Sequence, residues 1–373
     1  MSDPQSDSIQ VDLGERAYDI HVGEGLIARA GELIAPLLSK PETIIVTDEN
    51  VAGLWLEPLE ASLSGSAINA RTLVMKPGEA TKSFDNLQTV TDFFLSAPVE
   101  RGSIVIAFGG GVIGDLTGFA AATTLRGIDF VQIPTTILAQ VDSSVGGKTG
   151  INTAHGKNLI GAFHQPRMVL ADTEVLSTLP DRERQAGYAE IVKYGLLGDA
   201  AFFGWLEENG NRVLSGDSQA LRHAVMQSCR AKAQIVGDDE REKGARALLN
   251  FGHTFGHALE AENAYSSALL HGEGVAIGSV LALALSERMG LCPVGRADRL
   301  TTHLKSLGIP SRISDIGGAD GWKPDVLLDH MRVDKKVSGG KLTFILAHDI
   351  GDAFVTCDVD ESDVLSVLEE SLV

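Results

Sequence analysis

The sequence of 373 residues has few cysteines and a shortage of positive charge. Its three cysteines, Cys229, Cys292 and Cys357, lie far apart, and no Cys-x-x-Cys pair occurs. This spacing argues against a zinc ribbon or a disulfide framework and favours a reducing compartment. The formal net charge of −19 at pH 7 argues against broad attraction to nucleic acid or anionic lipid. An anionic substrate would therefore need a local cluster of cationic side chains.

Long apolar segments are also missing. The uncharged apolar run at 274–286 is too short to cross a bilayer. Residues 1–8 have neither the basic start nor the apolar stretch of a signal peptide. We therefore expect a soluble cytoplasmic protein that binds neither nucleic acid nor membrane. At roughly 150 residues per domain, the length predicts two domains or three small ones, and 44% hydrophobic residues suffice for a sizeable core.

Short apolar segments in the first half predict buried strands at 43–48, 103–108, 130–134 and 168–172. They alternate with helical stretches, which is typical of a parallel sheet covered on both faces. Ligands of such sheets bind at the carboxyl ends of the strands, where the glycine-rich and polar segments of this chain fall.

After residue 180 the pattern changes to helices, predicted at 181–195, 219–236, 246–262 and 272–290. Segments 341–347 and 353–358 predict a hairpin before a last helix. We therefore predict a disordered tail at 1–10, an α/β domain at 11–180 and a mainly helical domain at 181–373.

Two histidines stand out in the segment 248–260. In a helix, His253 and His257 project from one face, one turn apart. They can be two ligands of one metal, one ligand and one acid/base group, or buried residues that bond backbone carbonyls. A zinc-protease helix is excluded because Thr254 stands where that motif has its glutamate.

The glycine-rich segment 109–115 follows a predicted strand and precedes a helix-like run. Gly109, Gly111 and Gly114 fit the pattern G-x-G-x-x-G. This context favours dinucleotide binding over a plain tight turn. Asp48, at the end of an earlier strand, is placed to hold a ribose, and the turn at 77–82 is a candidate rim of the same site.

The segment 142–149 resembles a nucleoside-triphosphate loop, but Asp142 stands where that motif requires glycine. This difference argues against a kinase or ATPase. Lys148, Lys157, Asn158 and Arg126 remain as candidate phosphate and hydroxyl ligands, or as solvated loop residues.

Glu190 and Lys193 share one helical face, three residues apart. Glu190 lies among apolar residues, where an unpaired carboxylate is costly. A salt bridge or a metal would remove that cost. Glu190, His253 and His271 would make a two-histidine, one-carboxylate set with an open fourth position, as in catalytic zinc sites.

Taken in order, the segments 109–115, 132–152, 156–163, 189–195, 248–260 and 271–273 resemble the 3-dehydroquinate synthases of the sugar-phosphate cyclase superfamily. The resemblance implies a shikimate-pathway enzyme that serves chorismate and aromatic amino acid biosynthesis. It implies conversion of 3-deoxy-D-arabino-heptulosonate 7-phosphate to 3-dehydroquinate and phosphate through transient oxidation by NAD, β-elimination and an aldol closure. It also implies a divalent metal, zinc or cobalt.

The resemblance assigns site residues to this chain. The implied metal ligands are Glu190, His253 and His271. The implied NAD contacts are Asp48, Gly78, Glu79, Lys82, Gly110, Gly111, Val112, Ile113, Gly114, Asp115, Thr135, Thr136, Lys148, Lys157, Val175, Leu176, Ser177 and Thr178. The implied substrate contacts are Asp142, Lys148, Asn158, Lys193, Lys232, Arg246, Asn250, His257 and one of Lys335 and Lys336, for which we favour Lys336. Arg126 matches a residue that reaches the neighbouring active site, which implies a homodimer.

Three alternatives remain: a sister sugar-phosphate cyclase, a metal-dependent alcohol dehydrogenase of related fold that releases NADH, and a catalytically inactive binding protein. A substrate with a carboxylate is favoured by the presence of Lys232, Arg246, Asn250 and Lys336. The substrates of the sister cyclases lack that carboxylate. The complete set of candidate ligands argues against an inactive protein.

Overall fold

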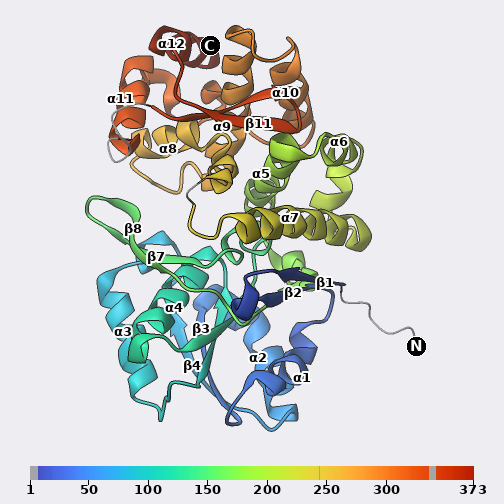
Figure 1. Cartoon of the computed structure of the whole chain (residues 1–373), viewed down its shortest axis with the longest axis vertical. Helices are drawn as coiled ribbons and strands as arrows, with labels where there is room; N and C mark the ends of the chain where they lie inside the picture. The colour runs from blue at the N-terminus through green and yellow to red at the C-terminus, as the bar shows by residue number, and fades with distance from the viewer. Residues whose placement is uncertain (1–6, 243, 336–341) are drawn as a thin grey trace. The chain divides into compact units, whose positions relative to one another are not determined.

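The computed structural model describes residues 7–242, 244–335 and 342–373. The chain divides into two compact units. Figure 1 colours the chain by residue number, from blue at the N-terminus to red at the C-terminus. The first unit runs to Leu179 and also contains Ser218–Arg241. The second consists of Pro180–Asp217 and Glu242–Val373.

A sheet of seven described strands forms the centre of the first unit, in the order β1-β2-β9-β6-β5-β3-β4. Strands β1 and β2 pair antiparallel, and all the other neighbours pair parallel. The bounds are β1 (Asp7–Val11), β2 (Tyr18–Gly23), β3 (Glu42–Asp48), β4 (Asn69–Met75), β5 (Ile104–Gly109), β6 (Asp129–Pro134) and β9 (Met168–Asp172). The predicted parallel sheet and its four predicted strands are therefore confirmed.

The prediction of a disordered tail at 1–10 is wrong for residues 7–10, which belong to β1. Ile9 lies opposite Ile20 and Val11 lies opposite Tyr18, and all four side chains are buried. The alternation of polar and apolar residues is that of an edge strand with one covered face. Residues 1–6 lie outside the described part of the chain.

Helices cover the sheet on both faces. Ile44, Val46 and Val105 share one core with α3 (Phe84–Leu95) and α4 (Gly111–Thr123). Ile45 and Ile106 point the opposite way along the same strands and are also fully buried. The helices α1 (Ala30–Ile34) and α2 (Glu49–Gly65) pack together, and α2 contacts β3 and β4. Burial of both faces explains why these strands read as continuous apolar runs.

The first unit also contains the antiparallel hairpin of β7 (Lys148–Thr153) and β8 (Gly156–Phe163), which Figure 1 shows extending from the sheet. Helix α7 (Ser218–Asp238) contacts β1 and β2 and belongs to this unit. The sequence analysis assigned these residues to the second domain. Amphipathic spacing predicts a helix but does not say which core its apolar face covers.

The second unit is mainly helical. Helix α9 is buried around most of its circumference and contacts α5, α8, α10, α12 and β10, so it forms the core of this unit. The bounds are α5 (Asp181–Gly198), α6 (Ala200–Leu214), α8 (His253–Glu262), α9 (His271–Arg288), α10 (Arg296–Ser306), α11 (Pro324–Lys335), α12 (Glu361–Ser371), and a hairpin of β10 (Phe344–Asp349) and β11 (Asp352–Thr356). Shorter helical turns are η1 (Gly14–Arg16), η2 (Ile27–Arg29), η3 (Ala35–Leu37), η9 (Ile313–Asp315) and η10 (Ala319–Gly321).

The single helix predicted at 246–262 is wrong. The segment forms a 3-10 turn, η8 (Ala245–Asn250), and then a separate helix that starts at His253. Between them Phe251 is extended and Gly252 has φ of 78°, a left-handed conformation that glycine adopts without strain. The break makes His253 the first residue of α8.

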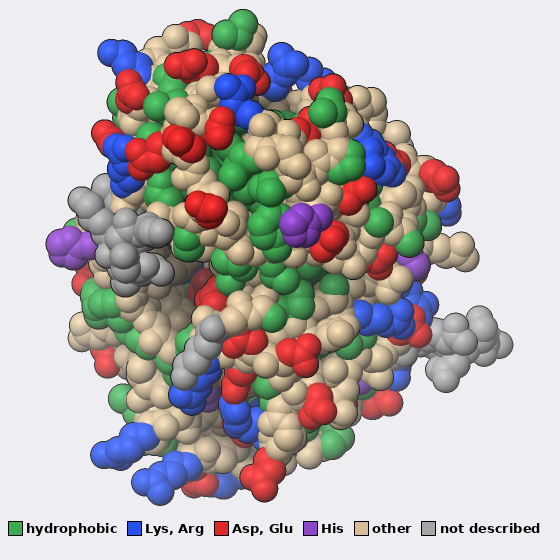
Figure 2. All heavy atoms as spheres, turned by 45° about the horizontal axis from the view of Figure 1, so that its top comes forward, with side chains coloured by type: hydrophobic (Ala, Val, Ile, Leu, Met, Phe, Trp, Pro, Cys, Tyr) green, Lys and Arg blue, Asp and Glu red, His purple; other side chains and the backbone are tan. Residues whose placement is uncertain are grey.

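Charged side chains of both signs are interspersed on the face shown in Figure 2. In the described part of the chain, no helix combines the length and apolar character that a membrane span requires.

Candidate active site

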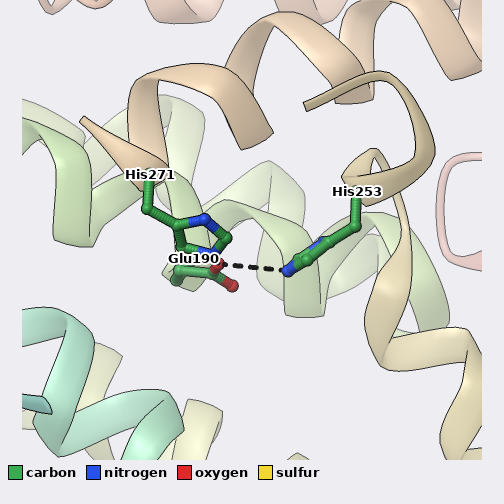
Figure 3. A group of neighbouring side chains, drawn as sticks. All are labelled: Glu190, His253 and His271. Atoms are coloured by element: carbon green, nitrogen blue, oxygen red, sulfur yellow. Dashed lines mark ion pairs between the residues drawn. The ribbon is translucent and has the colours of Figure 1, made fainter. Parts of the chain in front are cut away.

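Three side chains from three helices of the second unit lie close together. Glu190 lies in α5, His253 begins α8 and His271 begins α9. One ligand atom of each lies within 4.8 Å of the other two. Figure 3 shows both imidazole rings turned toward the carboxylate. The structure thus brings together the three candidate ligands that were predicted from the sequence.

The break before α8 sets the orientation of His253. Its Nδ1 lies 3.1 Å from the carbonyl oxygen of Phe251, so that the Nδ1–H donates to this carbonyl. The other ring nitrogen, Nε2, faces Oε1 of Glu190 at 3.8 Å. A histidine held in this way presents the lone pair of Nε2, which is the form that binds a metal.

His271 is positioned by the close approach of α9 to α5. A Cβ on Gly272 would overlap the carbonyl group of Ala186 in α5, so only glycine fits there. Ala186 lies one helical turn before Glu190. The missing side chain at position 272 therefore lets α9 begin directly beside the carboxylate.

Arg182, also in α5, holds the loop before α9. Its guanidinium donates to Oε1 and Oε2 of Glu273 at 2.6 and 2.7 Å. It also donates to the carbonyl oxygens of Ser267 and Ala268 at 3.0 and 2.7 Å. Glu273 in turn accepts the N–H of Leu270 at 2.8 Å. Helix α5 thus supplies one candidate ligand and fixes the backbone that carries another.

The two oxygens of Glu190 have different neighbours. Oε2 lies 2.5 Å from Nζ of Lys193, and both side chains are almost completely buried. Oε1 faces Nε2 of both His253 and His271, at 3.8 and 3.5 Å. Lys193 therefore restrains the carboxylate on one side while the other side faces the imidazoles.

The protonation states of the histidines differ. Burial, with the charge of Lys193, lowers the pKa of His253 to about 3, so its ring is neutral. Burial also disfavours the charged form of His271, but hydrogen bonds with Glu190 and Glu260 outweigh it and raise its pKa to about 10. A divalent cation would replace that proton, because metal ligands must be deprotonated.

This donor set fits a divalent metal. Two imidazole nitrogens and one carboxylate oxygen suit zinc or cobalt and leave further coordination positions for a substrate. The candidate ligands come from well-packed helices, and the buried Lys193 contacts the carboxylate of Glu190. The residues present therefore meet the requirements of the metal that the resemblance implies.

A second cluster of polar residues lies in the first unit, around Lys82. Its Nζ lies 2.7 Å from Oδ2 of Asp115 and 3.6 Å from Oε1 of Glu79, and it donates to Oδ1 of Asn158. The side-chain amide of Asn152 donates to Oε1 of Glu79 at 2.7 Å, and its oxygen accepts the N–H of Asn158 at 2.9 Å. Three segments distant in sequence thus form one hydrogen-bonded network.

Lys82 carries its charge in this network. Burial disfavours the ammonium group, but Asp115 and Glu79 outweigh it and raise the pKa of Lys82. The pKa of Asp115 is also raised, because its burial is only partly offset by Lys82. Each charge is therefore sustained by the other.

Asp142 and Lys232 form a further pair in the first unit. Nζ of Lys232 lies 2.9 Å from Oδ1 of Asp142 and also donates to its backbone carbonyl. Asp142 lies in η6 (Ala139–Ser143), a turn of π-helix, which is a rare geometry often found at functional sites. Lys232, predicted in the second domain, is therefore held by helix α7 of the first unit.

The glycine-rich segment lies at the carboxyl ends of β5 and β6. Strand β5 ends at Gly109 and α4 begins at Gly111, so the positive end of the helix dipole is presented there. A Cβ on Gly110 would lie 3.1 Å from Cγ2 of Thr136, and the N–H of Thr135 donates to Gly109 at 3.0 Å. This geometry fits the pyrophosphate of a dinucleotide.

Asp48 ends β3 and caps α2, because its carboxylate accepts the N–H groups of Asn50 and Val51 at 2.9 and 3.1 Å. Trp55 of α2 donates to Oγ1 of Thr178 at 2.9 Å. This contact joins α2 to η7 (Thr173–Thr178), the turn that contains the predicted NAD contacts Val175 to Thr178. In the described structure the carboxylate of Asp48 serves as a helix cap, and its ribose contact stays a prediction.

Several other predicted residues of the first unit occupy turns and hairpin positions. Gly78 has φ of 101° and precedes η4 (Glu79–Thr81). Lys148 begins β7, and Lys157 lies in β8. Arg126, in η5 (Thr124–Arg126), has a backbone φ of 69°, which is unusual for a residue other than glycine or asparagine.

The remaining predicted residues of the second unit surround the histidines in sequence. Arg246 is buried, with 1% of its surface exposed. Asn250 donates to Oε1 of Glu242 at 3.1 Å. The rings of His257 and His253 have centroids 5.4 Å apart, as expected for one helical face. Lys336 lies outside the described residues.

The residues predicted from the sequence do not include Asn152, Glu242 and Glu260. Asn152 lies within a family motif and links Glu79 to Asn158. Glu260 lies at the end of the histidine helix and contacts His271. A glutamate seven residues after a candidate ligand shares its helical face, and this spacing was the available signal.

Comparison with known proteins shows which protein family the chain matches. The family model described as 3-dehydroquinate synthase N-terminal matches residues 72–186, and the one described as 3-dehydroquinate synthase C-terminal matches residues 187–337. A 3-dehydroquinate synthase of Rhodospirillum rubrum is 58% identical, over 99% of this chain and 96% of that protein.

Two solved structures are similar over nearly the whole chain. The 2-epi-5-epi-valiolone synthase of Streptomyces hygroscopicus, solved with NAD+ and Zn2+ bound, has a TM-score of 0.86 and 29% identity, over 95% of this chain and 96% of that chain. A 2-deoxy-scyllo-inosose synthase, solved with carbaglucose-6-phosphate, NAD+ and Co2+, has a TM-score of 0.86 and 26% identity, over 98% of this chain and 100% of that chain.

The fold is that of the sugar-phosphate cyclases. The 58% sequence identity with a 3-dehydroquinate synthase over almost the full length narrows the class from the sugar-phosphate cyclases to one of its families. The chain belongs to the 3-dehydroquinate synthase family.

Proposed function

We propose that the chain converts 3-deoxy-D-arabino-heptulosonate 7-phosphate to 3-dehydroquinate and phosphate, with NAD and a divalent metal, zinc or cobalt. The observation that carries this proposal is the Glu190–His253–His271 cluster in a chain that belongs to this family. A division of labour follows. The first unit binds the dinucleotide, and the second unit binds the metal.

Glu190, His253 and His271 are the proposed metal ligands. When bound, a divalent cation acidifies the hydroxyl groups that it polarises, which eases loss of hydride from the adjacent carbon. Lys193 contributes by its 2.5 Å contact with Oε2 of Glu190, which keeps Oε1 turned toward the imidazoles. The same lysine is a proposed substrate contact.

The proposed dinucleotide site lies at the carboxyl ends of β3, β5 and β6. When bound there, NAD would supply a hydride acceptor that is regenerated within each turnover. The N-terminus of α4 at Gly111 is suited to the pyrophosphate. The network of Lys82, Asp115 and Asn158 keeps charged groups in fixed positions, so little rearrangement is needed when the ligand binds.

The cationic residues would let a chain of net charge −19 hold a substrate that carries both a carboxylate and a phosphate. We assign Lys148, Asn158, Arg126 and His257 to the phosphate, with His257 also a proton relay. We assign Lys232, Arg246 and Lys336 to the carboxylate and ring hydroxyls, with Asp142 and Asn250 as further contacts. The departing phosphate can remove the proton itself, so the protein has mainly to orient and neutralise it.

A homodimer is part of the proposal. Leu125, Arg126 and Gly127 all have positive φ, a costly conformation for the first two that suits a turn held in place to present Arg126. Strand β8 exposes Leu159, Ile160 and Phe163. Apolar side chains grouped on one hairpin are typical of a covered interface. Sedimentation of the wild type and of Phe163→Asp checks this, and a monomeric wild type would contradict it.

We also place the reaction in the cytoplasm. Three widely separated cysteines without a disulfide fit a reducing compartment. Fractionation of cells that express the native gene tests this placement, and recovery from the periplasm would contradict it.

The direct test of the reaction compares three substrates: the heptulosonate phosphate, sedoheptulose 7-phosphate and glucose 6-phosphate. We expect turnover of the first only, without accumulation of NADH. The two solved cyclases make a sister activity the specific alternative, and turnover of either uncarboxylated sugar instead would support it. A steady rise in reduced nicotinamide absorbance during turnover would instead support a dehydrogenase.

A further inference from the structure

Glu260 lies on the far side of His271 from the other candidate ligands. Its Oε2 is 3.2 Å from Nδ1 of His271, while Nε2 of the same ring is 3.5 Å from Oε1 of Glu190. The ring thus has one carboxylate at each nitrogen. Because the two nitrogens point in opposite directions, one metal ion bound at Nε2 leaves Nδ1 to Glu260.

The carboxylate of Glu260 is buried near the C-terminal end of its helix. Only 4% of its surface is exposed. It lies in the last turn of α8, where the negative end of the helix dipole disfavours an acidic side chain. Burial of a charged group is costly unless a partner compensates. Glu262, two residues later, is more exposed and pairs with His330 at 2.8 Å.

The side chain has a defined route to His271. Its Cγ lies 3.8 Å from the position that a Cβ on Gly274 would occupy, so the stem of Glu260 passes beside α9 at a residue without a side chain. The contact joins the end of α8 to the start of α9, two helices that already carry His253 and His271.

We propose that Glu260 is a positioning residue that accepts the Nδ1–H of His271 and thereby fixes the tautomer and the ring orientation needed for metal binding through Nε2. This inference rests on the proposed metal site. Carboxylates that hold a ligating imidazole in this way also raise its basicity, and their loss typically weakens metal binding about 10–100-fold.

The test measures zinc affinity of the purified full-length protein by competition with a chromophoric chelator. We expect one equivalent of zinc in the wild type. Glu260→Leu, which removes the acceptor, should bind zinc about 10–100-fold more weakly. Glu260→Gln keeps the shape and one acceptor oxygen, so its loss should be smaller. Glu262→Gln is the matched control on the same helix and should bind zinc as the wild type does.

Thermal melting separates positioning from simple support of the fold. Without metal, Glu260→Gln keeps one acceptor oxygen for the Nδ1–H of His271 but loses the charge pair with that ring, so its melting temperature should fall modestly. The increase in melting temperature that zinc produces should be smaller in the variant. A purely structural role would instead lower the melting temperature by the same amount with and without zinc and leave the affinity unchanged.

Three outcomes would overturn this inference. The Glu260 variants could bind zinc as tightly as the wild type, or they could show the purely structural pattern of melting. The wild type could also bind a second zinc equivalent that the Glu260 variants lose. The last result would make Glu260 a ligand, since it forms a second possible set with His257 and His271. His271→Ala distinguishes failure of the proposed function. If it keeps a full equivalent, the metal site itself is misassigned.

Discussion

The two units hold their candidate functional residues in different ways. In the second unit Glu190, His253 and His271 are carried by helices, two of them at a first helical position. In the first unit Glu79, Lys82 and Asn158 lie on turns and a hairpin and are held by one another. Backbone geometry therefore sets the proposed metal site, whereas side-chain pairing sets the polar cluster around Lys82.

This difference predicts different failures. Loss of a side chain in the second unit should remove a ligand and leave the fold largely intact. Loss of a charge in the first unit should leave its buried partner uncompensated and destabilise that unit. Small changes in how helices approach should affect the metal site and spare the network around Lys82.

The largest effect is expected for His271→Ala. Loss of a ligand should remove the bound metal and lower turnover by at least about a thousandfold, since metal stabilisation of charge is worth several kcal/mol. Metal content and phosphate release measure both. His348→Ala is the control, because His348 is exposed and stacks on Phe354. An inactive His271→Ala that still holds a full equivalent of metal would contradict the ligand assignment.

Lys82→Met should destabilise the first unit, because Asp115 would lose its counter-charge. Breaking a buried ion pair costs about 3–5 kcal/mol. The melting temperature should fall by several degrees, and NAD binding should weaken. Lys82→Met combined with Asp115→Asn is the control and should recover most of the stability. If the double variant melts no higher than the single one, the two charges do not sustain each other.

Gly272→Ala should disturb the metal site through the backbone. Its Cβ would overlap the carbonyl of Ala186 and push α9 from α5. Overpacking of this kind costs about 1–3 kcal/mol, and zinc affinity should fall with it. Gly204→Ala in α6, where a Cβ meets no atom within 4 Å, should leave affinity unchanged and slightly stabilise the helix. Equal affinity in both variants would show that the approach of α9 to α5 does not set the site.

The smallest effect concerns His303, whose Nε2 lies 3.0 Å from the hydroxyl of Tyr188. Burial lowers the pKa of His303 below its ordinary value of 6.5. As the pH falls through 6.5, the unfolded chain takes up a proton that the folded chain does not, so stability decreases by at most about 1.4 kcal/mol per pH unit. His303→Gln should show a weaker loss of melting temperature between pH 7 and pH 5. An unchanged pH dependence would contradict a neutral, buried His303.

The structure also explains which strands and helices could be predicted from the sequence. The strands at β3, β5, β6 and β9 were found because burial on both faces leaves continuous apolar runs. Strand β1 was missed because an edge strand with one covered face alternates polar and apolar residues in a short, polar segment. The break at Gly252 was missed because one glycine inside a helical pattern does not by itself end a helix.

For the candidate site, residue chemistry selected Glu190, His253 and His271, since few other roles suit a carboxylate among apolar residues or paired imidazoles. Their convergence depends on tertiary contacts such as Gly272 against Ala186, which no local pattern contains. The unit that holds Lys232 was mistaken for the same reason. Helix α7 follows two helices of the second unit but packs on β1 and β2.

We expect the release of phosphate by this chain to depend on both the dinucleotide and the metal. The most direct measurement is phosphate release from 3-deoxy-D-arabino-heptulosonate 7-phosphate, with NAD and zinc each supplied or withheld after removal of bound metal. The account predicts release only when both are present, with 3-dehydroquinate formed and NAD not consumed. Release that continues without NAD, or NADH that accumulates in proportion to product, would contradict it.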